Sequence, residues 1–437
     1  MINWVRLYAM RRELNEIEYL NWCFGQPYNI VISVRIRGNI PPDRLQSALD
    51  KAQQRHPLLK VNTILDEQDM PWFVSEGVGA ISLKVVDRAG EDHALRITEK
   101  ELATPFDMNK PLESPLPLMR VTLLRPPNPA AEPADIIISA QHTISDGMSM
   151  VFLVRDLLYF MTNPKHPVTV LDVTASTEDI FPLNVRKRVP KSALKFKASL
   201  LFMKLYLRLK FRRGTQKPRT FAPSSKIHSW QLTVDQTEDL LARCKQERVS
   251  VQSALCTAFL TTFTAVNTPV NLRPQLALPV GEAFGLYAGA AVIKMKYDAK
   301  ADFWDNARRF HGKLRKSLQD PFSVFRLFSK LVPFKAMQEY FRLFADLISD
   351  QHPFAITNLG SFDKIGVRFQ VEDLRVESFF GGVSEIIDAS VLTVYTIDEV
   401  MHFHFHYMEH VMNTSEAEEL VSKAMNMLIS AAEKRIE

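Results

Sequence analysis

The sequence IIISAQHTISDGMSM, residues 136–150, passes from an apolar run into a helix-forming segment through the polar stretch QHTISDG, residues 141–147. The apolar run predicts a strand, and the apolar spacing at 148–161 predicts a helix. Asp146 stands where a helix N-cap belongs, because its carboxylate can accept backbone N–H groups of the first turn. His142 therefore lies in the turn between a strand and a helix, a place where functional side chains are often found.

The imidazole of His142 has the chemistry of a general base. Its ordinary pKa near 6.5 keeps much of the ring neutral at pH 7, and a neighbouring helix N-terminus disfavours the imidazolium. Such a base can raise a rate about 100- to 10,000-fold. The bare pattern is weak, since 11 His and 49 acidic residues give about 0.6 HxxxD matches by chance. An exposed loop histidine without a catalytic role is the alternative.

The composition bounds the class of protein. A chain of 437 residues with 46% hydrophobic and 24% charged residues is long enough for two globular domains. We expect a soluble, monomeric, cytoplasmic protein, because the N-terminus lacks a signal-peptide pattern and no apolar run reaches about 18 residues. Three widely spaced cysteines, Cys23, Cys244 and Cys256, predict free and mostly buried thiols rather than a disulfide framework.

A basic segment divides the chain. Residues 186–219 contain 13 Lys or Arg and no Asp or Glu, although the whole chain has a net charge of only +5. We predict an N-terminal subdomain at 1–165, a basic interdomain connection at 166–225 and a C-terminal subdomain at 226–437. One predicted helical face of the connection carries only apolar residues, namely Phe196, Leu200, Met203, Leu207 and Phe211.

This basic segment has three interpretations: a solvated linker, a surface that binds an anionic membrane, or a docking site for an acidic acyl carrier protein. The apolar face argues against a plain solvated linker, and peripheral membrane contact through 186–219 is the favoured interpretation. No aromatic stacking module accompanies the basic residues, so nucleic acid is not an expected partner.

The remaining pattern predicts strands mixed with helices in both halves, which indicates a mixed α/β fold. Pro41 and Pro42 open one predicted helix, which ends before Pro57. The other predictions tested below are a helix at 11–22, strands at 28–37, 59–64, 353–357, 374–380, 391–397 and 401–407, helices at 251–263 and 415–432, and a turn at 269–276.

QHTISDG resembles the HHxxxDG loop of the condensation-domain and alcohol acyltransferase superfamily, whose members have the chloramphenicol acetyltransferase-like fold. Further matches follow in the order of that family: RHPLLKV at 55–61, FDMNKP and PLMRVTLL between 106 and 124, VNLRPQL at 270–276 and TNLGSF at 357–362. The resemblance implies two similar subdomains, each a mixed sheet with helices, and an active site at their interface.

The resemblance also implies the roles of particular residues. His142 corresponds to the base that deprotonates the acceptor, and Asp146 to a structural carboxylate that pairs with Arg273. Gly147 allows the acyl donor to approach the backbone closely. Asn358 lies near the site and is a candidate for substrate binding. The implied co-substrate is a thioester, either acyl-CoA or the phosphopantetheine of an acyl carrier protein, with no bound cofactor and no metal.

Two departures from the family pattern bear on the reaction. Gln141 stands where many condensation domains have their first histidine, and the DFGWG motif of the plant branch is missing. We therefore expect an O-acyltransferase acting on a hydrophobic alcohol, an expectation that the Phe-rich stretch 322–344 supports only weakly. The alternatives are a free-standing condensation enzyme that forms amides, and a catalytically degenerate binding module.

The sequence HFHFHY at 402–407 places three histidines on one face of a predicted strand. Imidazoles are good zinc ligands, but no cysteine or fourth ligand is evident nearby. A polar sheet face is therefore the favoured interpretation of His402, His404 and His406.

Overall fold

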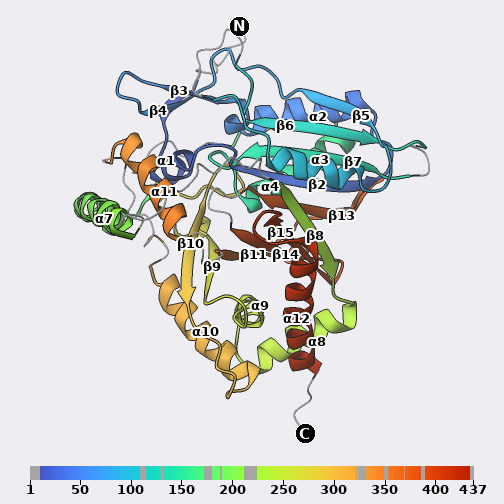
Figure 1. Ribbon diagram of the computed structural model, residues 1–437. Helices are drawn as coiled ribbons and strands as arrows, with labels where there is room; N and C mark the ends of the chain where they lie inside the picture. The colour runs from blue at the N-terminus through green and yellow to red at the C-terminus, as the bar shows by residue number, and fades with distance from the viewer. Residues whose placement is uncertain are drawn as a thin grey trace.

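The computed structural model of the chain describes most of the sequence and contains three β-sheets with helices packed against them (Figure 1). The described residues are 10–108, 115–128, 132–171, 180–187, 189–210, 224–320, 322, 330, 332–348, 353–368, 370–384 and 389–433.

The first large sheet has six strands in the order β12-β13-β2-β7-β6-β5. Helices α2 and α4 pack on one face through the main hydrophobic cluster, and α3 packs on β2 and β7 with a smaller cluster of its own. The bounds are β2 Asn29–Arg37, β5 Leu83–Asp87, β6 Met119–Arg125, β7 Ala134–Gln141, β12 Gln370–Val371, β13 Leu374–Val383, α2 Pro42–Arg55, α3 His93–Leu102 and α4 Gly147–Thr162.

The second large sheet has six strands in the order β10-β9-β11-β14-β15-β8. Helices α8, α9, α10 and α12 cover it and share a separate core cluster. The bounds are β8 Ser225–Gln231, β9 Ala265–Asn271, β10 Ala288–Lys294, β11 Phe354–Ser361, β14 Ser390–Ile397, β15 Val400–Met408, α8 Val234–Gln246, α9 Val251–Phe259, α10 Phe303–Leu318 and α12 Thr414–Glu433.

The remaining elements belong to neither of the two large sheets. A three-stranded sheet has the order β1-β4-β3, and α11 packs against both α1 and α7. The bounds are β1 Arg11–Glu13, β3 Asn62–Leu65, β4 Pro71–Val74, α1 Glu16–Cys23, η1 Pro57–Lys60, α6 Leu183–Arg186, α7 Val189–Lys210, η2 Arg273–Gln275 and α11 Phe334–Ile348.

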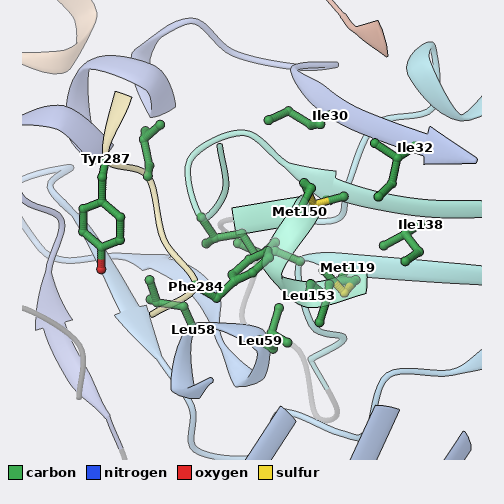
Figure 2. Packing of buried hydrophobic residues seen from close by; sticks show 14 of the residues in the cluster. Ile30, Ile32, Leu58, Leu59, Met119, Ile138, Met150, Leu153, Phe284 and Tyr287 are labelled. Atoms are coloured by element: carbon green, nitrogen blue, oxygen red, sulfur yellow. The ribbon is translucent and has the colours of Figure 1, made fainter. Parts of the chain in front are cut away.

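A segment from the C-terminal part of the sequence joins the first sheet. Strand β13 pairs antiparallel with β2, so residues 370–383 extend the first sheet although they follow β11 of the second. Phe284 also inserts into the N-terminal core, beside Leu58, Leu59 and Leu153 (Figure 2). The cores are thus not divided at one point in the sequence, and the predicted C-terminal segment 226–437 contributes to both.

Most predicted strands and helices are present, with displaced ends. The predicted helix at 11–22 is wrong in its first turn, where Arg11–Glu13 forms β1 and pairs with β4. Asn15 caps the helix instead, because its side chain accepts from the backbone N–H groups of Ile17 and Glu18. The predicted strand at 59–64 begins late, since Pro57 opens the 3₁₀ turn η1 before β3.

Three further differences concern element ends and faces. Helix α9 ends at Phe259, four residues before its predicted end, and the predicted turn at 269–276 includes the last residues of β9. The alternating apolar and polar residues of β2 are typical of a strand with one exposed face, but β2 is buried on both faces because α3 covers the second. The three cysteines are free and buried, as predicted. No helix among the described residues is long and apolar enough to cross a membrane.

Candidate active site

His142 follows the last residue of β7, in the turn that leads into α4. Strand β2 pairs with β7 so that Asn29 lies opposite Gln141. This register places Tyr28 beside the histidine: the backbone N–H of His142 donates to the Tyr28 carbonyl at 2.8 Å, and the two rings stack with centroids 4.7 Å apart. The strand pairing therefore fixes both the backbone and the ring plane of His142.

The tautomer of His142 follows from one hydrogen bond. Its Nδ1 lies 2.8 Å from the backbone carbonyl oxygen of Ser145, which can only accept. Nδ1 therefore carries the proton, and the neutral ring has its lone pair at Nε2. Burial lowers the pKa of His142 below the ordinary value of 6.5, and the Ser145 carbonyl and the Asp146 charge oppose this only in part. The ring is thus a neutral base at neutral pH.

Asp146 is the N-cap of α4 and also a partner of the second half of the chain. Its Oδ1 accepts from the backbone N–H of Ser149 at 2.8 Å. Its Oδ2 accepts from Arg273 Nη1 at 2.9 Å and from the Tyr287 N–H at 2.8 Å. The Asp146 carboxylate is thus bound by α4, by Arg273 and by the Tyr287 backbone, and it holds the turn through these three contacts.

Ser149 extends this contact between the halves. Its hydroxyl accepts from Arg273 Nη2 at 2.7 Å and donates to the carbonyl of Gly285 at 2.6 Å. The Arg273 guanidinium also lies 4.7 Å from the centroid of the Tyr287 ring. Since Ser149 and Asp146 are both buried, these contacts lock the first turn of α4 onto the segment between η2 and β10.

Gly147 lies against Leu359 of β11. A Cβ atom built on Gly147 would stand only 2.8 Å from Leu359 Cδ2, closer than carbon atoms approach one another. The neighbouring Asn358 is partly buried, and its Oδ1 accepts from the Gly360 N–H at 2.9 Å. The TNLG stretch therefore reaches the start of α4, and the absence of a side chain at Gly147 makes room for it.

Gln141 is buried and turned into the loop. Its Oε1 accepts from the backbone N–H of Thr143, and the residue is 1% exposed. The side chain therefore stabilises the turn from inside and does not point outward beside His142. Its Nε2 is buried and has no hydrogen-bond partner among the described residues.

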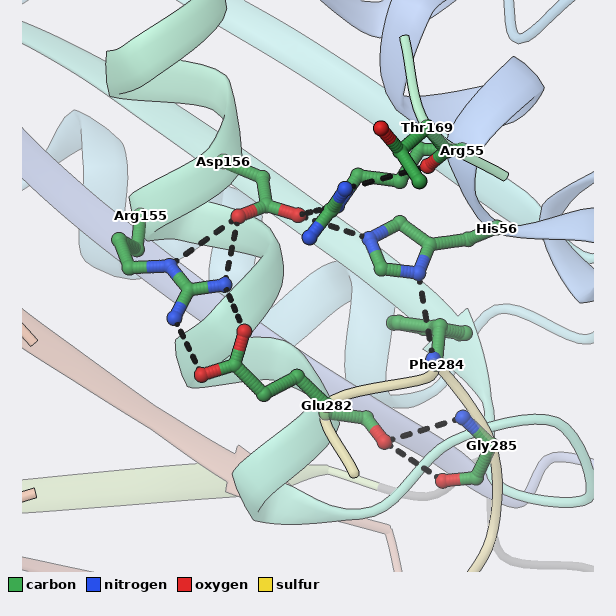
Figure 3. Close-up of polar contacts among 9 residues, drawn as sticks. Arg55, His56, Arg155, Asp156, Thr169, Glu282, Phe284 and Gly285 are labelled. Carbon is green, nitrogen blue, oxygen red and sulfur yellow. Dashed lines mark hydrogen bonds and ion pairs between the residues drawn. The ribbon is translucent and has the colours of Figure 1, made fainter. Parts of the chain in front are cut away.

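A second polar network connects His56, Asp156 and Arg155 with the segment that carries Phe284 (Figure 3). His56 is 1% exposed; its Nδ1 accepts from the Phe284 N–H at 3.2 Å and its Nε2 donates to Asp156 at 3.0 Å. Burial alone raises the pKa of Asp156, but the hydrogen bond from His56 and the charge of Arg155 lower it below its ordinary value. Arg155 also binds Glu282 through two contacts of 2.7 Å. The RHP stretch thus anchors the segment that carries Phe284.

Of the three histidines of β15, His404 and His406 lie under the first sheet, and His402 is partly exposed. His404 and His406 are buried, and a Cβ on Gly382 of β13 would lie 3.3 Å from the His406 side chain. His404 contacts Ser229 Oγ at 2.8 Å and the Tyr395 hydroxyl at 3.2 Å. The histidines form a polar sheet face, as predicted, and β13 covers part of that face. Within the described ranges, no group of three His, Cys, Asp or Glu is placed to hold a metal ion.

The structure places four of the five predicted site residues at one turn: His142, Asp146 and Gly147 lie between β7 and the start of α4, and Arg273 binds Asp146. Asn358 stands one residue from Leu359, which touches Gly147. Tyr28, Ser149 and Tyr287 were not singled out from the sequence. Ser149 had a local signal, since the third residue after an N-cap is the usual hydrogen-bond partner. The other two depend on contacts distant in sequence.

The Phe-rich stretch 322–344 is mainly core where it is described. Phe322 and Phe341 are buried, and Phe334 packs on Trp22 with centroids 4.2 Å apart. Phe325, Phe328 and the side chain of Phe344 lie outside the described residues.

Two family models match the chain one after the other. Residues 23–169 match the condensation domain, and residues 223–383 match the phthiocerol/phthiodiolone dimycocerosyl transferase C-terminus. The first match includes His142 and Asp146, and the second includes Arg273 and Asn358. Together the two models cover both sides of the site.

Curated relatives are much longer proteins. Nonribosomal peptide synthetase kk1B of Curvularia clavata is 24% identical over 306 residues, which is 65% of this chain and 2% of that protein. Bacitracin synthase 1 of Bacillus licheniformis is 29% identical over 146 residues, 32% of this chain and 3% of that protein. The chain thus corresponds to a small part of each.

Solved structures of similar size share the whole fold. Polyketide synthase associated protein 5 from Mycobacterium tuberculosis aligns with a TM-score of 0.63 and 16% identity, over 97% of this chain and 98% of that one. The trichothecene 15-O-acetyltransferase TRI3 from Fusarium sporotrichioides aligns with a TM-score of 0.68 and 12% identity, over 97% and 95%. The fold is that of the chloramphenicol acetyltransferase-like condensation enzymes. The chain thus combines a condensation-domain N-terminal half with a C-terminal half that matches the phthiocerol/phthiodiolone dimycocerosyl transferase C-terminus.

Proposed function

We propose that the chain is an O-acyltransferase that moves an acyl group from a thioester to the hydroxyl of a hydrophobic alcohol, with His142 as the general base. The observation that carries this proposal is the hydrogen bond from Nδ1 to the Ser145 carbonyl. It leaves the lone pair at Nε2, and the lowered pKa keeps that nitrogen unprotonated at neutral pH.

The proposed reaction needs one proton carrier. Nε2 of His142 takes the proton of the acceptor hydroxyl while the oxygen attacks the thioester carbonyl carbon. The carbon–sulfur bond of the resulting tetrahedral intermediate then breaks, and the imidazolium returns the proton to the departing sulfur. The products are an ester and a free thiol. The Ser145 carbonyl and the Tyr28 ring hold the imidazole in one orientation through both steps.

The donor in this proposal is acyl-CoA or the phosphopantetheine thioester of an acidic acyl carrier protein, used as a co-substrate. Two likenesses favour an ester product: the C-terminal family model carries the name of a phthiocerol/phthiodiolone dimycocerosyl transferase, and TRI3 is named a 15-O-acetyltransferase. The relatives named as nonribosomal peptide synthetases favour the amide alternative. The inward-turned Gln141 separates this loop from a two-histidine site and supports the ester.

The test is a screen for thiol release. The intact chain is incubated with acyl-CoAs and acyl carrier protein thioesters of several chain lengths, together with pooled hydrophobic alcohols or amines, and products are identified by mass spectrometry. We expect one ester formed for each thiol released. His142→Ala should lower the rate about 100- to 10,000-fold, whereas His410→Ala, at an exposed histidine, should not.

Each contrary outcome selects another function. Amides formed with amines, without esters from alcohols, identify a free-standing condensation enzyme. If no thioester is consumed, or if folded His142→Ala keeps full turnover, the chain is a binding module with this fold.

A further inference from the structure

Helix α7 has apolar side chains on two opposite faces. Its inner face carries Phe196, Leu200 and Met203, which are at most 8% exposed. Phe196 packs on Tyr340 of α11 with ring centroids 4.8 Å apart. The side chain of Leu207 and all of Phe211, predicted to continue this face, lie outside the described residues.

The outer face of α7 is apolar and uncovered. Leu201 is 69% exposed, Phe202 72%, Leu205 57% and Tyr206 42%. In the described parts of the chain, no other window of six residues contains two large hydrophobic side chains with this degree of exposure. Single exposed apolar side chains are normal on soluble proteins, whereas a contiguous group marks an interaction surface. Figure 1 shows α7 at the margin of the molecule, on the outer side of α11.

The charge around this outer face has one sign. Lys195 and Lys197 are exposed and lie within one to two turns of Phe202. Lys204 does not add to this positive charge, since its Nζ pairs with Glu339 of α11 at 2.7 Å. The pair helps to hold the helix in place. The sequence around the helix, 186–219, contains no acidic residue. A partner of this face therefore has to accept apolar side chains and positive charge together.

We propose that α7 docks on a membrane surface that contains anionic lipids. Helices that lie in a bilayer interface insert Phe and Leu side chains at the boundary between headgroups and acyl chains, while Lys side chains reach the headgroups. An acidic carrier protein would satisfy the charge of Lys195 and Lys197. It would leave unexplained why Leu201 and Phe202, the two most exposed large apolar side chains, stand at the centre of the face.

A continuous row of aromatic contacts joins this helix to the candidate active site. Tyr340 contacts Phe341, which packs on Phe24 with centroids 4.2 Å apart. Phe24 contacts Tyr28 at 5.2 Å, and Tyr28 stacks on the imidazole of His142. Through this row of rings, α7 is linked by direct packing to the imidazole of His142. If the proposed function is correct, docking brings that base near acceptors dissolved in the membrane.

The experiment is vesicle flotation with the full chain. Vesicles of phosphatidylcholine alone are compared with vesicles that also contain phosphatidylglycerol, at low and high salt. We expect binding to the anionic vesicles that weakens with salt. Replacing Lys195 and Lys197 by Gln should lower the partition coefficient about ten- to thirtyfold, and Leu201→Gln with Phe202→Gln at least about tenfold.

Matched controls remove the same chemistry elsewhere. Lys84→Gln with Lys423→Gln removes two exposed charges, and Leu241→Gln with Val292→Gln removes two exposed apolar side chains. These variants should bind like the unchanged protein, and all variants should keep its melting temperature because the replaced side chains are exposed.

Three results would overturn the proposal. The first is absence of binding to both kinds of vesicle, or equal loss in the control variants. The second is binding of an acidic carrier protein that depends on Lys195 and Phe202 while vesicles are ignored. The third is a dimer that Phe202→Gln disperses, again without vesicle binding. None of these measurements uses turnover, so they leave the acyltransferase proposal to its own test.

Discussion

Arg273 Nη1 donates to Asp146 Oδ2 at 2.9 Å, and this ion pair joins the turn after β9 to the first turn of α4. The two side chains are 9% and 4% exposed, so solvent screens the pair little. The residue that caps α4 therefore takes its orientation from the other half of the chain.

Asp146→Asn should lower the free energy of unfolding by about 3 to 5 kcal/mol, because it leaves the Arg273 guanidinium buried without its counter-charge. Asn is as good an N-cap as Asp, so the substitution isolates the charge from the cap. Urea denaturation gives the free energy of unfolding. The double variant Asp146→Asn with Arg273→Met should lose less free energy of unfolding than the sum of the losses of the two single variants. Strict additivity, or a loss below about 1 kcal/mol, would contradict a coupled buried pair.

The acid limb of the pH–rate profile should lie below pH 6.5. In the proposed reaction His142 works as a base only when neutral, so kcat/KM should fall as pH decreases through the pKa of His142. Burial lowers that pKa from its ordinary value, which moves the fall to more acidic pH and leaves a plateau at neutrality. The measurement is kcat/KM against pH for the unchanged protein and for His142→Ala. An acid limb that persists in the variant would belong to another group.

Much of this site follows from local sequence. The strand, turn and helix around His142 were predictable because apolar spacing and an N-cap residue are properties of neighbouring residues. The pair of Asp146 with Arg273 was expected from the family resemblance alone, since no local rule joins residues 127 positions apart.

The remainder depends on strand register and on packing between distant segments. Tyr28 reaches His142 only because β2 and β7 pair with Asn29 opposite Gln141, and a shift of one residue would remove that contact. Strand β13 joins β2 across more than 300 residues, which no period in either strand indicates. The burial of His406 follows from that same crossing.

Gly147→Ala should destabilise the protein by no more than about 1 kcal/mol through the contact of the added Cβ with Leu359. The added Cβ meets the end of a flexible side chain, so Leu359→Ala should relieve most of this cost in the double variant. The thermal midpoint measures the rescue. The KM for the acyl donor provides the contrast: if Gly147 also admits the donor, as the family resemblance implies, the double variant recovers stability while KM stays raised. Recovery of both would limit Gly147 to packing.

The buried histidines of β15 should make stability fall with acid. Burial lowers the pKa of His404 to about 3 and of His406 to about 4, whereas both titrate near 6.5 when unfolded. Below pH 6.5 the unfolded chain therefore binds protons that the folded chain excludes. The free energy of unfolding should then decrease by up to about 2.7 kcal/mol per pH unit for the two residues together.

His406→Leu tests this assignment. Both ring nitrogens of His406 are buried without a hydrogen-bond partner among the described residues, so an apolar side chain of similar size replaces it without losing a polar contact. The variant should reduce the slope of unfolding free energy against pH by about 1.4 kcal/mol per unit between pH 6 and 4. A slope that His406→Leu does not alter would mean that this ring binds its proton equally well in the folded and unfolded protein, which contradicts its burial under β13.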